Sequence, residues 1–498
     1  MFPSMMKRRD ALKTIGGLAG AAGLARFLPG CDDKDDGPVG ITTYVYLMME
    51  NRSFDHALGA RALLEGLPVD GLKAGLFNND KNGQPIAPYA APDDRGAAPP
   101  SVCDIDPPHG WDAAHASFNG GANDGFLVQH QDAHAGSLTA TETMKYMTRD
   151  NLPVTWALAD AYTTCDRWFC SVMGPTLPNR AYWHAGTSFG IDNNDAVIDQ
   201  LAAVPVPTIY NRLDEAGVDW AYYYGSLAVL ALLANPGPYQ LDLGPGDGTG
   251  RIRRFGDAKI GNGQFFKDCA AGTLPSVVYI DPAFGTNDDH PPVHPILGQE
   301  LIAAVYTALA KSPQWKNILL VITYDENGGY FDHVPPPTTT DDTLAKYGVD
   351  GFQQLGFRVP AIVIGPYVKQ GYVSSVQLDH TSALKHLQNT FGLESLNVHV
   401  DAANDLTDCL DLDRLAAGKP AAPVEIPTIN ADEWPWTDAS CMSSGGFRAA
   451  DPITEYADLH PEAFAGYDLR ADSDDYLRSI REYLQKHQGT IARTSKSG

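Results

Sequence analysis

The sequence contains few positively charged residues for its length. Its 498 residues include 36 lysines and arginines against 61 aspartates and glutamates, which gives a formal net charge of -25 at pH 7. Binding to the phosphates of nucleic acids requires a basic surface, so this balance disfavours a nucleic acid as the partner. It does not exclude a small phosphate ester that is held at a metal ion.

Other features are missing as well. The seven cysteines show no spacing typical of a zinc site, and the chain contains no internal repeat. The apolar run TIGGLAGAAGLA at 14–25 is too short for a membrane-spanning helix. What is present is the composition of a globular protein, with 44% hydrophobic and 10% aromatic residues.

Residues 1–31 have the character of a targeting segment. A twin arginine, Arg8-Arg9, precedes the short apolar run, and LPGC at 28–31 resembles the cleavage site of a bacterial lipoprotein. We therefore expect export by a bacterium, to the periplasm, to the cell envelope as a lipoprotein, or to the medium. Cys31 is either lipidated or incidental to a simple cleaved signal.

After this segment the chain is expected to have three parts. They are an acidic linker (32–40), one large catalytic domain (41–415) and an extension packed on that domain (416–498). Beyond Cys31, the cysteines are Cys103, Cys165, Cys170, Cys269, Cys409 and Cys441. An even number in an exported chain permits up to three disulfides. Free thiols are the alternative, because a domain of this size needs no covalent staples.

Apolar, β-branched runs alternate with helical patterns along the chain. The expected strands are 41–48, 218–225, 275–281, 317–325 and 359–366, and the expected helices are 207–217, 294–313, 382–393 and 474–487. Near-continuous apolar runs suit strands that are covered on both faces. The alternation therefore predicts an α/β fold with a mostly parallel central sheet between helices.

Polar residues crowd the ends of two of these strands. The first strand runs into ENRSFDH, which begins with Glu50 and Asn51, and the fourth runs into Asp325 and Glu326. Adjacent carboxylates repel each other unless a cation or a proton neutralises them. The four side chains offer hard oxygen ligands that suit one divalent ion such as Ca²⁺, Mg²⁺ or Mn²⁺. A solvent-facing acidic turn is the alternative. We expect the rest of ENRSFDH (Arg52, Ser53, Asp55 and His56) to brace the loop.

A third candidate is the turn around Thr176. Prolines on both sides of it stiffen the backbone and would present the hydroxyl in one geometry. Metal coordination would activate such a hydroxyl as a nucleophile, whereas a helix-capping threonine is the alternative. Asn179 or Arg180 would steady phosphate oxygens, unless the arginine is structural.

Histidines in the loops are candidate proton donors. His109, His115 and His290 are of this kind, whereas His294 is expected to open the helix that follows it. Two Asp-His pairs are either site residues or braces behind the site. They are Asp332-His333 and Asp379-His380.

Taken in order, the stretches ENRSFDH, GPTLPNR, DHPP, DENGGYFDHVPPP and DHTSALKHL resemble the non-specific phospholipase C family of bacteria and plants. Together with related acid phosphatases, that family belongs to the alkaline-phosphatase-like α/β superfamily. The motifs extend from about residue 41 to 395, most of the chain, and the stretch from Cys165 to Arg180 matches the phospholipase C pattern particularly closely.

The resemblance implies a role for each matching residue. Thr176 would be the nucleophile and would form a phospho-threonine intermediate. His290 would stabilise the phosphoryl group or protonate the leaving oxygen, and His109 would flank the same pocket, with His115 as its competitor. The implied metal ligands are Glu50, Asn51, Thr176, Asp325 and Glu326.

The expected activity is hydrolysis of phosphatidylcholine-like phospholipids to diacylglycerol and a phosphorylated head group, with peripheral contact to the membrane. An acid phosphatase that uses the same pocket on a small phosphate ester is the alternative. From another class, an envelope lipoprotein that only binds a ligand is disfavoured by the intact ligand set. A sulfatase is disfavoured because the nucleophile turn holds neither Cys nor Ser.

Overall fold

The computed structural model describes residues 40–91, 106–194, 207–226, 228–230, 250–256, 263–430 and 469–489. The predicted signal peptide, Cys31, the linker up to residue 39 and much of the predicted extension lie outside these residues. Within them, no helix combines the length and the apolar character that a bilayer-crossing helix requires.

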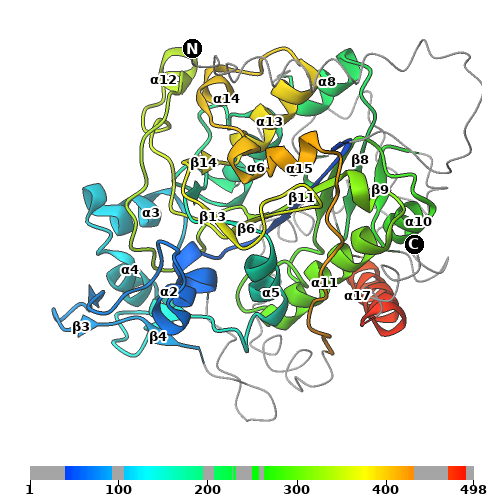
Figure 1. The fold of residues 1–498 in the computed structure, drawn as a ribbon. Coiled ribbons are helices and arrows are strands. Elements are labelled where there is room, and N and C mark those ends of the chain that lie inside the picture. The colour runs from blue at the N-terminus through cyan, green and yellow to red at the C-terminus, as the bar shows by residue number, and fades with distance from the viewer. Residues whose placement is uncertain are drawn as a thin grey trace, which may run out of the picture.

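The core is a single eight-stranded sheet (Figure 1). From edge to edge its strands are β13 (Tyr372–Ser374), β6 (Thr163–Cys165), β12 (Ala361–Ile364), β11 (Ile318–Tyr324), β1 (Thr43–Met49), β10 (Val277–Asp281), β8 (Trp220–Tyr224) and β9 (Ile252–Arg254). The five strands from β11 to β9 are parallel to one another. Only β12 runs against its neighbours β11 and β6, so the prediction of a mostly parallel sheet is confirmed.

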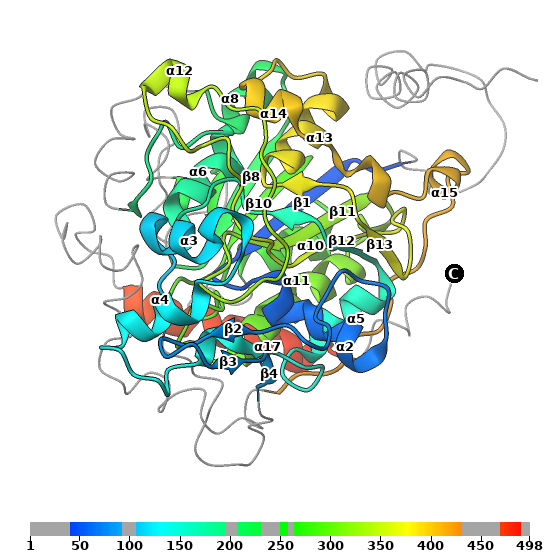
Figure 2. The same ribbon diagram turned by 90° about the vertical axis from the view of Figure 1, so that its left-hand side faces the viewer.

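Helices cover both faces of this sheet, as Figures 1 and 2 show. On one face lie α6 (Thr176–Ala185), α8 (Ile209–Glu215) and α13 (Thr381–Phe391), and on the other lie α5 (Pro153–Ala161), α11 (Pro295–Lys311) and α17 (Leu469–His487). Every residue of the central strands β1 and β11 is therefore buried. This double cover explains why their sequences are almost continuously apolar.

The predicted helices correspond to α8, α11, α13 and α17. His294 opens α11 as expected, because its Nδ1 accepts a hydrogen bond from the backbone N–H of Ile296. The remaining elements are η1 (Asp55–Gly59), α2 (Ala60–Glu65), β2 (Asn78–Asn79), β3 (Pro85–Ile86), β4 (Tyr89–Ala90), α3 (Trp111–Phe118), η2 (Asn119–Gly121), α4 (Phe126–Ala133), η3 (Glu142–Met144), β5 (Lys145–Tyr146), β7 (Trp168–Phe169), α10 (Gln264–Ala271), η4 (Trp315–Asn317), α12 (Thr343–Tyr347), β14 (Leu378–Asp379), α14 (Val398–Ala402), η5 (Leu406–Cys409) and α15 (Leu412–Ala416).

The register of the central strands brings two of the polar loops together. β1 and β11 pair in parallel, with Met49 opposite Tyr324. Glu50 and Asp325 therefore leave the sheet side by side, and the backbone N–H of Asp325 donates to the carbonyl of Met49 at 3.1 Å. This is the carboxyl edge of the parallel strands, where open α/β sheets place their ligands.

Candidate active site

The loops after β1 and β11 are joined by their backbones. The N–H of Asn51 donates to Oδ1 of Asp325 at 3.2 Å, and the N–H of Arg52 donates to the carbonyl of Glu326 at 3.1 Å. Asn51 has a φ of 58°, a left-handed conformation that asparagine tolerates better than most residues. A Cβ atom at Gly328 would collide with the carbonyl oxygen of Asn51. The glycine after Asn327 is therefore required by the close approach of the two loops.

The side chain of Arg180 places a positive charge at this edge of the sheet. Its fully buried guanidinium donates to Asp325 at 3.2 Å and to Asp281 at 3.2 Å, and it lies 3.3 Å from Glu50. These three carboxylates come from the ends of the adjacent strands β11, β10 and β1. Arg180 thus neutralises part of the negative charge of these carboxylates, for which the sequence analysis expected a metal ion alone. Of the two alternatives left open for this arginine, its contacts favour the structural one.

Oxygens without a hydrogen-bond partner mark the place where a cation would fit. In the described part of the chain, Oδ1 of Asn51, Oγ1 of Thr176 and Oε1 of Glu326 accept or donate no hydrogen bond, although all three side chains are fully buried. Burying such groups unpaired is costly, so proteins rarely do it. Carboxylate, amide and hydroxyl oxygens are the donors that hard divalent ions prefer. The residues present therefore fit a metal ion of this kind.

The predicted ligands do not, however, form the tightest cluster of ligand atoms. Among the described residues, two groups bring three such atoms within 4.8 Å of one another, namely Asp106 with His109 and His290, and Asp55 with Asp332 and His333. Neither group contains the predicted carboxylate ligands Glu50, Asp325 and Glu326. The five-residue ligand set therefore stays a prediction.

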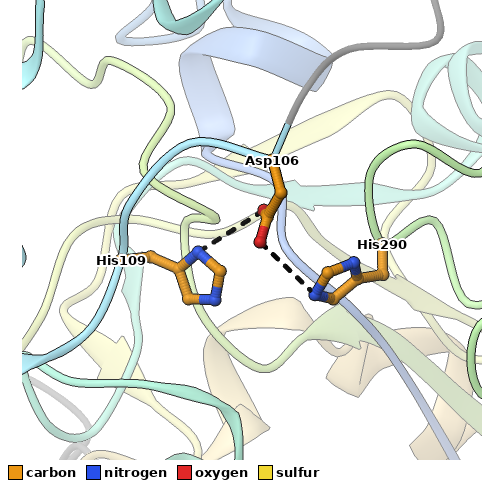
Figure 3. A group of neighbouring side chains, drawn as sticks. All are labelled: Asp106, His109 and His290. Carbon is orange, nitrogen blue, oxygen red and sulfur yellow. Dashed lines mark ion pairs between the residues drawn. The ribbon is translucent and has the colours of Figure 1, made fainter. Parts of the chain in front are cut away.

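Figure 3 shows the first group, which joins the two predicted catalytic histidines. Oδ1 of Asp106 lies 3.5 Å from Nδ1 of His109, and Oδ2 lies 3.8 Å from Nε2 of His290. Each histidine also directs its Nδ1 to a nearby backbone carbonyl, at 2.7 Å for His109 and 2.6 Å for His290. Asp106 was not among the predicted residues. In the sequence, only its position three residues before His109 indicated that it could lie near that histidine.

His109 also reaches the predicted metal ligands. Its Nε2 lies 3.4 Å from Nδ2 of Asn51 and 3.7 Å from Oε1 of Glu326. Burial alone would lower the pKa of His109, but the negative charges of Glu326 and Asp106 outweigh it and raise this pKa to about 9. The negative charges of these two carboxylates therefore favour the protonated form of His109 in the metal-free protein.

Thr176 begins α6, and its hydroxyl does not cap the helix. The N-cap residue is Pro175, and no side chain makes a capping hydrogen bond there. Asn179 holds the preceding turn, because its side chain accepts from the N–H of Val172 and donates to the carbonyl of Gly174. The alternative that the Thr176 hydroxyl caps the helix is thus excluded. The side chain of Asn179 hydrogen-bonds the backbone of the protein itself. The amino end of a helix also favours a bound phosphate, because its N–H groups and dipole attract negative charge.

The remaining polar residues of ENRSFDH brace the loop, as predicted. Arg52 donates to the carbonyl of Asp289 and to the Tyr330 hydroxyl. Ser53 donates to the carbonyl of Phe331 at 2.7 Å, and Nδ1 of His56 bonds the Lys145 carbonyl at 2.8 Å.

Asp55 belongs to a buried ionic cluster behind the site. Its carboxylate pairs with His333 at 2.6 Å and with Arg358 at 3.2 Å, and Arg358 also donates to Asp332 at 2.9 Å. Arg358 and His333 together give the two aspartates two cationic partners, so a metal ion is not needed there. The cluster ties the loop after β1 to the loop after β11, so Asp332 and His333 act as braces.

Asp379 and His380, the pair at the start of α13, also hydrogen-bond other parts of the protein. Nε2 of His380 bonds the carbonyl of Asp325 at 2.6 Å, and Asp379 accepts from the hydroxyl of Ser171 at 3.0 Å. His399 lies between two carboxylates, 3.2 Å from Asp341 and 3.7 Å from Asp379.

His115 lies apart from the cluster of Asp106, His109 and His290. Its Nδ1 bonds the carbonyl of Trp111 one turn earlier in α3, and its ring packs on the Trp111 ring with centroids 4.3 Å apart. This placement favours His109 over its predicted competitor.

Comparison with known proteins gives one family and several relatives. The chain matches the Phosphoesterase family over residues 41–394. It is 32% identical over 433 residues to phospholipase C A of Mycobacterium tuberculosis, which covers 79% of this chain and 82% of that one. It is 34% identical over 361 residues to non-specific phospholipase C5 of Arabidopsis thaliana, which covers 67% of this chain and 65% of that one.

Among solved structures, one similar chain is a protein in the alkaline phosphatase superfamily from Vibrio parahaemolyticus. It is 10% identical to this chain and covers 81% of it, with 79% of its own length matched and a TM-score of 0.34.

Proposed function

Because this chain belongs to the Phosphoesterase family and is a phosphoric ester hydrolase, we propose that it is a phospholipase C. It would hydrolyse phosphatidylcholine-like phospholipids to diacylglycerol and a phosphorylated head group. The similarity to relatives named phospholipase C, from a bacterium and from a plant, supports this substrate class. An acid phosphatase activity on small monoesters is the alternative.

The observation that carries the proposed chemistry is the buried hydroxyl of Thr176. It lies at the amino end of α6, and no group in the described part of the chain hydrogen-bonds it. A structural threonine would normally satisfy its hydroxyl, as the great majority of buried polar atoms do. An unpartnered oxygen of this kind is suited to attack the phosphorus atom of a substrate that binds next to it.

In the proposed first step, Oγ1 of Thr176 attacks phosphorus in line with the leaving diacylglycerol oxygen. The threonine proton passes to solvent, and Nε2–H of His290 donates a proton to the leaving oxygen. His109, with the Asn51 side chain beside it, would bind the phosphoryl oxygens. A divalent ion held by Glu50, Asn51, Thr176, Asp325 and Glu326 would supply Lewis-acid stabilisation of the negative charge.

In the second step, water releases the phosphorylated head group. The neutral Nε2 of His290 takes a proton from the water, and the water oxygen bonds phosphorus. The bond from phosphorus to Oγ1 of Thr176 breaks, and Oγ1 takes a proton from solvent, which restores the hydroxyl. Asp106 would hold the two histidines at a fixed spacing through both steps, because it contacts each of them.

A side-by-side assay distinguishes the two activities. The purified protein is given phosphatidylcholine vesicles and p-nitrophenyl phosphate under the same conditions. Release of diacylglycerol is the expected result, and turnover of the monoester alone would support the acid phosphatase instead. The variant Asn179→Ala is the control for disruption of the turn before Thr176. Its side chain hydrogen-bonds that turn but is not a proposed metal ligand, so its rates show how far a change in the turn alone lowers turnover.

We also propose that the protein is exported and meets its lipid at a membrane surface. The twin arginine and the LPGC motif support export. Fractionation of the producing bacterium tests this proposal, and recovery of the full-length chain in the cytoplasm alone would contradict it.

A further inference from the structure

Two buried cysteines from distant parts of the chain have their sulfurs in contact. Sγ of Cys165, the last residue of β6, lies 3.8 Å from Sγ of Cys409, the last residue of η5, across 244 positions of sequence. Both side chains are completely buried. The proposed hydrolysis uses neither of them.

Hydrogen bonds that do not involve the sulfurs hold both cysteines in place. Cys165 pairs with Ser374 in the register of β6 and β13, and the Ser374 hydroxyl donates at 2.7 Å to Asp408, the neighbour of Cys409. The carbonyl of Cys409 accepts from the N–H of Lys369 at 2.9 Å. These contacts therefore hold the backbones of the two cysteines near each other.

The surroundings disfavour a metal-binding or catalytic role for Cys165 in the folded protein. The contact with Cys409 and the burial of the site hold the pKa of Cys165 well above its usual range. The folded protein therefore keeps this sulfur as a thiol, whereas metal ligation and nucleophilic attack need the thiolate. Cys170 and Cys269 are buried free thiols as well.

We propose that Cys165 and Cys409 form an intramolecular disulfide, which joins β6, the second strand of the main sheet, to η5. The required oxidant is a second disulfide, such as that of a thiol oxidase or of oxidised glutathione. One cysteine attacks it, forms a mixed disulfide and releases one thiol. The other cysteine then attacks the mixed disulfide and releases the second thiol. Two cysteine S–H bonds are lost, one S–S bond forms, and two electrons and two protons pass to the oxidant.

The geometry needs little adjustment for this bond. The sulfurs must close only from 3.8 Å to about 2.05 Å. Because both thiols are inaccessible in the folded state, the oxidant reaches them during folding or in a local opening.

The disulfide would stabilise the attachment of η5 to β6 without touching the reacting groups. Cys165 is followed by the segment that leads to Thr176, and Cys409 lies near the end of the predicted catalytic domain. A bond across 244 positions closes a very long loop, and long loops lose the most chain entropy in the unfolded state when they are closed. We expect the oxidised protein to unfold at higher urea concentration than the reduced protein and to hydrolyse substrate equally fast.

Peptide mapping tests the bond itself. The full-length chain is refolded from urea in a buffer of reduced and oxidised glutathione, then denatured with N-ethylmaleimide and digested without reductant. The expected product is one cross-linked peptide pair that contains Cys165 and Cys409, with Cys269 alkylated. Alkylation of both Cys165 and Cys409, or linkage of either one to a different cysteine, would overturn the proposal.

Urea unfolding with and without dithiothreitol tests the consequence. The wild-type protein should lose stability in dithiothreitol, whereas Cys165→Ser and Cys409→Ser should unfold at the same urea concentration in both conditions. Cys269→Ser is the matched control and should keep the wild-type difference. A wild-type midpoint that does not respond to dithiothreitol would contradict the proposal. The mapping needs no variant, so a serine variant that fails to fold does not prevent the test.

Discussion

Replacing Thr176 with alanine separates catalysis from folding more sharply than any other change in the site. The change removes one hydroxyl and one methyl group from a fully buried position. The lost hydroxyl makes no hydrogen bond in the described part of the chain, and Pro175, not Thr176, is the N-cap of α6. The free energy of unfolding should therefore fall by no more than about 1.5 kcal/mol, the usual loss for a small buried truncation.

The effect on turnover should be far larger. Loss of a nucleophile lowers kcat by about 10⁴- to 10⁶-fold in enzymes of this general kind. That factor corresponds to about 5 to 8 kcal/mol of lost transition-state stabilisation. Thr176→Ser keeps a hydroxyl at the same place and should retain measurable turnover. Thr176→Ala should not.

The assay combines initial rates of diacylglycerol release with urea unfolding of the same preparations. Rapid acid quenching during turnover should also reveal phosphate on the peptide that contains Thr176, in the wild-type protein and not in the alanine variant. Wild-type turnover in a stably folded Thr176→Ala protein would refute the nucleophile assignment. Loss of activity together with loss of folding would show that the hydroxyl is structural.

Three further predictions concern the buried charges. Glu326→Gln should lower the divalent metal that copurifies with the protein, measured by elemental analysis, because it removes one proposed ligand charge. His399 has its pKa raised to about 9, since its hydrogen bond to Asp341 and the negative charges of Asp341 and Asp379 outweigh its burial. Its stabilising effect should be complete below about pH 6.5 and lost as the pH rises towards 9, and His399→Gln should weaken this dependence of urea unfolding. Arg358→Met should lower the free energy of unfolding by about 3 to 5 kcal/mol, because two buried aspartates lose their cation.

Each of these predictions has a control and a contradicting result. For the metal, Asp55→Asn is the control outside the proposed ligand set, and unchanged metal content in Glu326→Gln would contradict the ligand assignment. For the pH dependence, wild-type stability that stays constant between pH 6.5 and pH 9 would contradict the linkage. For Arg358→Met, the control is Arg149→Met on the surface, whose ion pairs are partly exposed. An equal effect of both would contradict the role of burial.

Much of the fold was predictable from local sequence, and so was the place at which the candidate site residues gather. Strands covered on both faces need apolar residues at almost every position, so β1 and β11 are visible as uninterrupted runs. The polar residues that interrupt such a run mark its end. In this way Glu50, Asn51, Asp325 and Glu326 were identified, and the register of β1 and β11 brings their loops together. The direction of β12 was not predicted, because strand periodicity does not depend on which way a neighbour runs.

The tertiary structure alone decided which charges meet. Arg180 reaches three carboxylates from three adjacent strands, and that contact depends on the strand order β11, β1, β10. Asp106 lies between His109 and His290, although 181 positions separate the two histidines in the sequence.

Sequence by itself therefore determined the layers of this protein, the ends of its central strands and its family. Those features follow from hydrophobic periodicity and from contiguous motifs, which are local properties of a chain. Other features depend on distances of 3 to 4 Å between residues that are remote in the sequence. They are the ion pair of Arg180 with Glu50, the contact of Asp106 with the two histidines, and the contact between Cys165 and Cys409. Such distances exist only after the strands have paired and the loops have packed, because contacts between remote residues are properties of the folded chain.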